Sequence, residues 1–145
     1  MVTQFRKLNE EDAALLFLAP VLVSILASWG KGGLSAAGKA EAIQMAHLKT
    51  FTADPQLLPY YKVVNNEFVE QFTFQSNKFR PFGEKQLKEL MSRINDVNST
   101  IAKLDPEYRQ LLHKSLFSYA EHVKKASRGL IENFIFPIPI NGFTV

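Results

Sequence analysis

The stretch from Ala13 to Trp29 is the feature that most limits the folds open to this chain. It reads AALLFLAPVLVSILASW and runs for 17 residues without a charge. A membrane-spanning helix needs about 20 apolar residues, and a shorter run is more typical of a core helix or a signal peptide. A helix that is apolar on every side fits the centre of a bundle. We therefore expect this stretch to form the buried central helix of an all-α domain.

Two other interpretations of the same stretch stay open. One is a membrane or interfacial segment, which would need only slightly more length. The other is a signal peptide with Arg6 and Lys7 as its basic region. Three acids at 10–12 then lie between that region and the apolar run, where they are unfavourable. Ile25 also stands where a cleavage site after residue 27 would need a small residue.

Composition places the chain among single globular domains. Its 145 residues suit one hydrophobic core, and 46% of them are hydrophobic against 21% charged. The lack of cysteine excludes disulfides, thiolate metal sites and a cysteine nucleophile. The net charge of +3 is a mild excess that does not by itself indicate nucleic acid. We expect one domain over residues 1–145, located in the cytoplasm.

Capping residues and apolar spacing predict three helices in the first half of the chain. The first runs from about 10 to 29, with a bend or a break at Pro20. The second begins after Ser35 and ends near Phe51, and the third begins near Leu58. The predicted inward residues are Ala36, Ala40, Ile43 and His47 in the second helix and Tyr61, Val64, Phe68 and Phe72 in the third.

A loop and two further helices are predicted in the second half. Residues 76–82, SNKFRPF, show no helical period and include a proline. Apolar residues at spacings of three and four predict a helix from 83 to 104. Asp105 and Pro106 mark the start of a last helix, and Gly129 is its predicted C-cap. The predicted inward residues of these two helices are Leu87, Leu90, Met91, Ile94, Val97, Ile101 and Leu104, then Tyr108, Leu111, Leu112, Leu116, Tyr119, Ala120 and Val123. The whole is predicted to be a bundle of about five main helices.

The C-terminal sequence differs in kind from the rest. Residues 130–145 read LIENFIFPIPINGFTV, in which two prolines forbid a helix and favour an extended segment. Because so many apolar side chains are costly in water, this arm is expected to pack on its own chain, on a second copy or on a partner. We expect Phe134, Phe136 and Ile138 to form an interface, and the chain to be a homo-oligomer through the arm.

The spacing of reactive residues forms no catalytic or metal-binding pattern. His47, His113 and His122 lack the spacing of three or four that helical metal ligands need. Many of the acids stand at helix starts, where capping explains them, and neither a nucleophile elbow nor a phosphate-loop motif occurs. We therefore predict no catalytic residue, no metal site and no cofactor.

Basic residues interleaved with Phe79 and Phe82 raise the question of nucleic acid. Charge and stacking of this kind hold single strands in some proteins. Here Glu84 and Glu89 reduce the net positive charge. We therefore favour a solvated charged face, with the aromatic side chains packed into the core at the loop. Nucleic acid is not an expected partner, and Phe79 and Phe82 are predicted instead to belong to a protein contact.

A resemblance to a known family rests on the sequence LVSILASWGKGGLSAAGKAEAI, from Leu22 to Ile43, with an echo at 116–131, LFSYAEHVKKASRGLI. This order of an apolar helix, a glycine turn and a helix rich in Ala and Glu resembles the half-motifs of TerB-like proteins, which are linked to tellurite resistance. The resemblance implies an all-helical fold and a stress-related role. In that family an aspartate of the turn and a later glutamate, downstream of the turn, hold metal ions. Trp29 stands at the position of that turn acid, Glu41 is the one stand-in for the later acid, and His122 takes the acid's position in the second copy. The resemblance therefore carries over the fold rather than the metal site.

Two functions are expected from these observations. The first is a non-catalytic interaction or scaffold protein of TerB-like type that contacts a protein partner or a copy of itself. The alternative is a small helical domain that binds an apolar ligand, or acts as an enzyme, in a pocket between the first, third and fifth helices. That pocket would be lined by Phe17, His47, Phe68, Phe72 and Tyr119, with His122 as a further contact residue.

Overall fold

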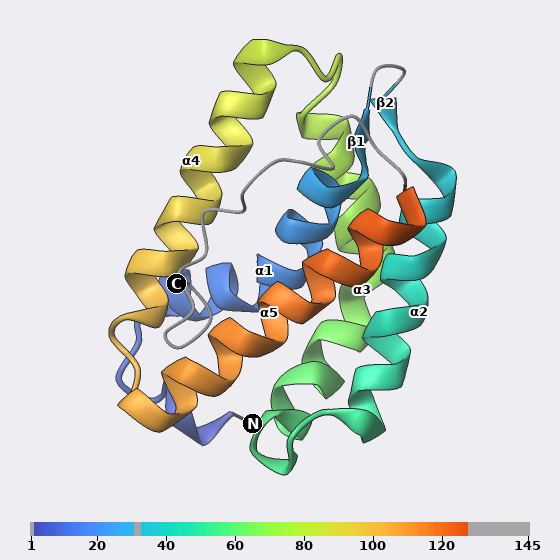
Figure 1. The fold of residues 1–145 in the computed structure, drawn as a ribbon. Coiled ribbons are helices and arrows are strands. Elements are labelled where there is room, and N and C mark those ends of the chain that lie inside the picture. The colour runs from blue at the N-terminus through green and yellow to red at the C-terminus, as the bar shows by residue number, and fades with distance from the viewer. Residues whose placement is uncertain (1, 31–32, 128–145) are drawn as a thin grey trace, which may run out of the picture.

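The protein is a bundle of helices arranged around one central helix. A computed structural model describes residues 2–30 and 33–127. Within these residues the helices are α1 (Glu10–Ser28), α2 (Ala36–Thr52), α3 (Leu58–Lys78), α4 (Glu84–Ile101) and α5 (Pro106–Ser127) (Figure 1). The described part also contains short 3-10 turns at Thr3–Phe5 and Pro55–Leu57. Two antiparallel strands of two residues each, β1 (Trp29–Gly30) and β2 (Gly33–Leu34), form a hairpin. The predicted all-α bundle of five main helices is confirmed.

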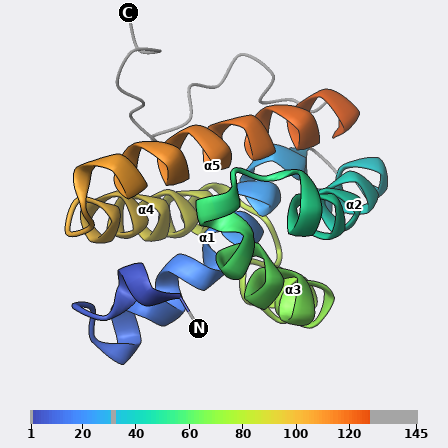
Figure 2. The same ribbon diagram turned by 90° about the horizontal axis from the view of Figure 1, so that it is seen from below.

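Helix α1 lies at the centre of the bundle. It contacts each of α2, α3, α4 and α5, and Figure 2 shows it between α5 on one side and α3 on the other. Every residue from Ala19 to Trp29 is buried. Among the described residues α1 is the one helix long and apolar enough to span a membrane, and 61% of its apolar window is buried inside the protein. The predicted buried central helix is confirmed.

A bend or a break was predicted at Pro20, and because Pro20 does not divide α1 the break is wrong. The helix is continuous from Glu10 to Ser28. A proline has no N–H to donate to the carbonyl four residues earlier, here that of Leu16. The hydroxyl of Tyr60, from α3, donates to this oxygen at 2.5 Å. A side chain from a neighbouring helix thus supplies the hydrogen bond that the proline removes.

The inward face of α2 differs from the predicted one. Ala36, Ala40 and His47 are exposed, and the buried residues are Gly38, Ala42, Met45 and Ala46. A Cβ atom at Gly38 would lie 2.6 Å from the Oγ atom of Ser28 and 2.1 Å from that of Ser127. The start of α2 therefore fits closely against the ends of α1 and α5, and small residues permit that approach. Ser35 caps α2 as predicted, accepting from the Gly38 N–H at 3.1 Å.

The other three predicted inward faces are confirmed in the main. In α3 the predicted residues Tyr61, Val64, Phe68 and Phe72 are all buried. In α4 the buried apolar residues are Leu90, Ile94, Val97 and Ile101, which face α1. In α5 all the predicted residues are buried except Leu111, which is half-buried. Val2 and Phe5, which precede α1, also join the core, and the sequence did not indicate this.

The predicted loop at 76–82 is shorter in the structure, because α3 continues to Lys78. Phe79 is 4% exposed and Phe82 is half-buried, and their ring centroids lie 6.5 Å and 5.1 Å from that of Trp29. Phe79 is thus part of the core of its own chain, and its predicted role in an interface is wrong. Phe82 has a φ of 63°, a left-handed conformation that a side chain of this size rarely adopts.

The C-terminal arm was predicted for residues 130–145. This segment, with Phe134, Phe136 and Ile138, and the predicted cap Gly129, lies outside the described residues.

Candidate functional site

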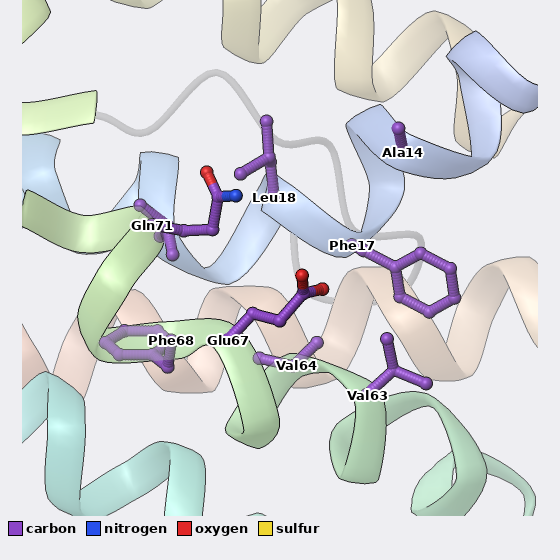
Figure 3. Close-up of a pocket in the computed structure, with 9 residues that line it drawn as sticks. Ala14, Phe17, Leu18, Val63, Val64, Glu67, Phe68 and Gln71 are labelled. Atoms are coloured by element: carbon purple, nitrogen blue, oxygen red, sulfur yellow. The ribbon is translucent and has the colours of Figure 1, made fainter. Parts of the chain in front are cut away.

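An apolar pocket lies between α1 and α3. Its volume is about 260 Å³, close to the smallest ligand pockets in proteins. Figure 3 shows Phe17 and Leu18 reaching from α1, with Val63 and Val64 from α3 beside Phe17. The lining residues are Ala14, Phe17, Leu18, Val21, Val63, Val64, Glu67, Phe68 and Gln71.

Helical periodicity explains how both walls of the pocket form. The α1 residues follow a spacing of three and four residues, which places them on one face of that helix. On α3, Val63, Glu67 and Gln71 stand four residues apart, next to the buried row of Val64 and Phe68. Figure 3 shows the Glu67 and Gln71 side chains extending from α3 toward α1. The pocket therefore has an apolar base and two polar side chains at its α3 edge.

A cluster of tyrosines backs the pocket. All four tyrosines of the chain belong to it, and each is at most 2% exposed. The ring of Phe17 stacks on that of Tyr60 at a centroid distance of 5.7 Å, and the ring of Phe68 lies 6.1 Å from that of Tyr119. Tyr60 and Tyr61 meet edge to face at 5.0 Å. The pocket wall is therefore continuous with the aromatic core of the bundle.

Three of the four tyrosine hydroxyls have partners inside the protein. Besides the Tyr60 bond to α1, Tyr61 shares a hydrogen bond of 2.5 Å with Ser115, and Tyr119 donates to the Ala42 carbonyl at 2.5 Å. The hydroxyl of Tyr108 has no hydrogen-bond partner among the described residues. Burial is the largest cause that raises the pKa of each tyrosine above its ordinary value. These phenols are therefore neutral at physiological pH and serve as packing and hydrogen-bonding groups.

The structure brings together only some of the residues predicted to line a pocket. Phe17 and Phe68 both line it. Tyr119 lies in the core behind, where its ring stacks on that of Tyr61, so the pocket has no wall from α5. Phe72 borders a different cavity, farther along α3. His47 is exposed on α2, where its ring meets that of Phe51 at 5.7 Å. The predicted grouping of all five residues is wrong, because aromatic rings fill the space between α3 and α5.

Several lining residues were missed by the sequence analysis. Val63, Glu67 and Gln71 lie on the flank of α3 next to its predicted inward face, and Ala14 and Leu18 lie on α1. The spacing of four along α3 is visible in the sequence and places Val63, Glu67 and Gln71 on one face of that helix. It could not show a pocket, because the facing residues of α1 were known only as part of a uniformly apolar run.

The histidines lie apart from one another. His122 is exposed, and its Nδ1 atom lies 2.8 Å from the Ser118 carbonyl of the preceding turn. His113 is buried on α5, and burial, followed by the charge of Arg109, lowers its pKa. Within residues 2–30 and 33–127 no group of three or more His, Cys, Asp or Glu side chains is placed to hold a metal ion.

Comparison with protein-family models, curated proteins and solved structures finds no match for this chain.

Proposed function

We propose that this chain is a non-catalytic interaction protein of TerB-like type that assembles with copies of itself through residues 130–145. Its location is the cytoplasm, and its role is stress-related. The observation that carries the proposal is the composition of this segment, which holds four isoleucines and three phenylalanines but a single charge, at Glu132. Side chains of this kind gain about 1.5–3 kcal/mol each when they leave water. A matching surface on a second copy supplies that burial.

The packing of the described helices also supports the proposal. The central helix α1 contacts α2, α3, α4 and α5, so four helices already surround it. The body also exposes three large apolar side chains, those of Phe51, Val69 and Phe74, which are 62%, 53% and 55% exposed. Phe74 and Val69 stand on α3 and Phe51 on α2. Because they are exposed apolar residues outside residues 130–145, they provide the matched control for the test of the arm.

The TerB-like part of the proposal concerns the fold and the stress-related role, without the metal site of that family. A long apolar helix, two short paired strands that contain Gly30 and Gly33, and a second helix follow one another in the order of the motif at Leu22–Ile43, which supports this part. Trp29, at the position of the turn acid, is buried against the rings of Phe79 and Phe82. An indole packed in this way is no metal ligand. The proposal therefore includes an interaction role without a metal.

The test replaces three arm residues in the full chain. The variant carries Phe134→Ser, Phe136→Ser and Ile138→Ser, and the matched control carries Phe51→Ser, Phe74→Ser and Val69→Ser. Both lose two phenylalanines and one aliphatic side chain. We expect sedimentation to show an oligomer for the parent and the control and a monomer for the arm variant, with equal helical circular dichroism. An arm variant of unchanged mass, or a control that dissociates in its place, would contradict the proposal.

A second candidate function is the binding of an apolar ligand between α1 and α3, and the pocket of about 260 Å³ lined by Phe17, Leu18 and Val63 favours it. Its probe is laurate, measured by the shift in melting temperature. A ligand at one hundred times its Kd stabilises the folded state by about 2.7 kcal/mol. The variant Ala14→Phe fills the pocket and should remove the shift, whereas Ala37→Phe, exposed on α2, should keep it. A parent protein that laurate does not stabilise would refute this candidate.

A further inference from the structure

A second cavity lies at the hairpin end of the bundle, where β2, the start of α2 and the end of α3 meet (Figure 1). Its volume is about 340 Å³. The lining residues are Gly33, Leu34, Ser35, Ala36, Lys39, Phe72, Thr73, Ser76, Asn77, Arg80 and Phe82. None of the residues of the pocket between α1 and α3 contributes to it.

The charge of this cavity is positive. Among the described residues its lining includes Lys39 and Arg80 but neither an aspartate nor a glutamate. Neither cation forms an ion pair with an acid among the described residues. By contrast, Lys103 on the far side of the bundle is paired with Asp12 at 2.7 Å. The cavity therefore presents two positive groups that no carboxylate of the described chain neutralises.

Aromatic rings hold both cations at the cavity wall. The Lys39 Nζ atom lies 5.9 Å from the centroid of the Phe72 ring, and the Arg80 Cζ atom lies 5.7 Å from that of Phe82. Arg80 also donates from Nε to the Asn77 Oδ1 atom at 3.2 Å. This bond uses one edge of the guanidinium and leaves its terminal N–H groups for another acceptor. The two charges are thus positioned by contacts that leave donor groups free.

Neutral donors border the same space. The hydroxyl of Ser35 accepts from the Gly38 N–H, so its own hydrogen is available, and Thr73 adds a second hydroxyl. The hydroxyl of Ser76 already donates to the Phe72 carbonyl at 2.6 Å, so it is not one of the donors available to a ligand. Helix α2 begins at the cavity, and the positive end of its dipole adds to the two side-chain charges. Donors therefore come from both α2 and α3 and from the segment that follows α3.

We propose that this cavity binds the phosphate group of a small organic phosphate. A phosphate offers more acceptor oxygens than a carboxylate, and a guanidinium, an ammonium and two hydroxyls on different elements can engage them together. The rings of Phe72 and Phe82 and the side chain of Leu34 give the organic part an apolar wall. This site goes beyond the proposed assembly function and shares none of its lining residues with residues 130–145. Phe82 is the one lining residue that the sequence had suggested as a protein contact.

The test measures the Kd of two probes, inorganic phosphate and phenyl phosphate, for the full chain by calorimetry at constant ionic strength. The variants Lys39→Gln and Arg80→Gln each remove one cavity charge. Lys62→Gln on α3 and Lys88→Gln on α4 are the matched controls, because both are exposed lysines outside the cavity. We expect millimolar or tighter binding by the parent, weakened about tenfold by each cavity variant and unchanged by each control. Phenyl phosphate should bind more tightly than inorganic phosphate.

Three results would overturn the assignment. The first is a parent protein that binds neither phosphate probe at millimolar concentration. The second is an equal loss of affinity in the Lys62→Gln and Lys88→Gln controls, which would indicate general charge attraction. The third is benzoate binding as tightly as phenyl phosphate, which would make the site one for carboxylates. Circular dichroism of each variant checks that the helices are intact.

Discussion

Helix α3 borders two cavities of opposite character. Its middle turns, through Val63, Val64 and Phe68, form one wall of the apolar pocket against α1. Its last turns face a cavity that holds Lys39 and Arg80, neither of which pairs with an acid in the described part of the chain. The walls of the first continue into the tyrosine core, whereas the charged residues of the second are exposed. The comparison teaches that the side chains of the apolar pocket contribute to the stability of the fold, whereas the exposed charged side chains of the second cavity can change with little effect on it.

The largest expected effect concerns the tyrosines behind the apolar pocket. The ordinary tyrosine pKa is 10.0, and burial raises it in all four. Above pH 10 the unfolded chain therefore loses phenol protons that the folded chain keeps, so the free energy of unfolding falls as pH rises. The slope is about 1.4 kcal/mol per pH unit for each tyrosine, or about 5 kcal/mol for four.

The measurement is a pH titration that follows tyrosinate absorbance and helical circular dichroism together. We expect both signals to change in one transition above pH 10, and tyrosinate to form at the ordinary pKa in denaturant. Tyrosinate that forms near pH 10 while the helices stay intact would show that the cluster is open to water.

The next effect compares an aromatic ring of the apolar pocket with an exposed ring on the same helix. Phe68 is 1% exposed and joins the pocket to the tyrosine core. Phe68→Ala should lower the free energy of unfolding by about 3–5 kcal/mol, because it removes a buried ring and leaves a void. Phe74→Ala, on the exposed face of the same helix, should change it by less than about 0.5 kcal/mol. Urea unfolding measures the free energy of unfolding of both variants. Equal losses in the two would contradict the claim that the pocket wall contributes to the stability of the fold.

A smaller effect is expected at the contact between α1 and α3 beneath the pocket. Tyr60→Phe leaves the Leu16 carbonyl without its donor and should lower the free energy of unfolding by about 1–3 kcal/mol. Pro20→Ala restores a backbone N–H to the same oxygen. The loss caused by Tyr60→Phe should therefore be smaller in the Pro20→Ala background. An identical loss in both backgrounds would show that the two groups are not coupled.

The smallest effect is expected at the charged cavity. Lys39→Gln and Arg80→Gln should each alter the free energy of unfolding by less than about 0.5 kcal/mol, since both side chains are exposed and neither is ion-paired within the described residues. Thermal and urea unfolding without phosphate provide the measurement. A loss above 1 kcal/mol in either variant would mean that this cavity, too, is part of the structural framework.

How far the fold could be predicted depended on the size of the side chains that pack. In α3 and α4 large aromatic and aliphatic residues recur every three or four positions, and the structure buries those faces. In α2 the contact face is formed by Gly38, Ala42, Met45 and Ala46. Glycine and alanine carry little hydrophobic signal, so the spacing of residues in α2 predicted a neighbouring face. Close approach between helices is visible only once the partner helices are in place.

The candidate site was predictable only in part for a related reason. Phe17 and Phe68 could be identified as large apolar residues on helices expected to meet. The sequence could not show that Tyr119 would fill the space beside α5, or that His47 would face solvent. The charged cavity joins Ser35 and Lys39 to Asn77 and Arg80, about 40 positions later. Local spacing carries no information about such a contact.

The central claim is self-assembly through residues 130–145, and native mass spectrometry of the untagged full chain tests it most directly. We predict the mass of an oligomer, which is two or more times the 16.4 kDa of one chain. It should fall to that of one chain when Phe134, Phe136 and Ile138 are replaced by serine. A parent protein that stays at 16.4 kDa over the whole concentration range would contradict the claim. A single chain that carries the mass of an apolar molecule would favour the pocket between α1 and α3 instead.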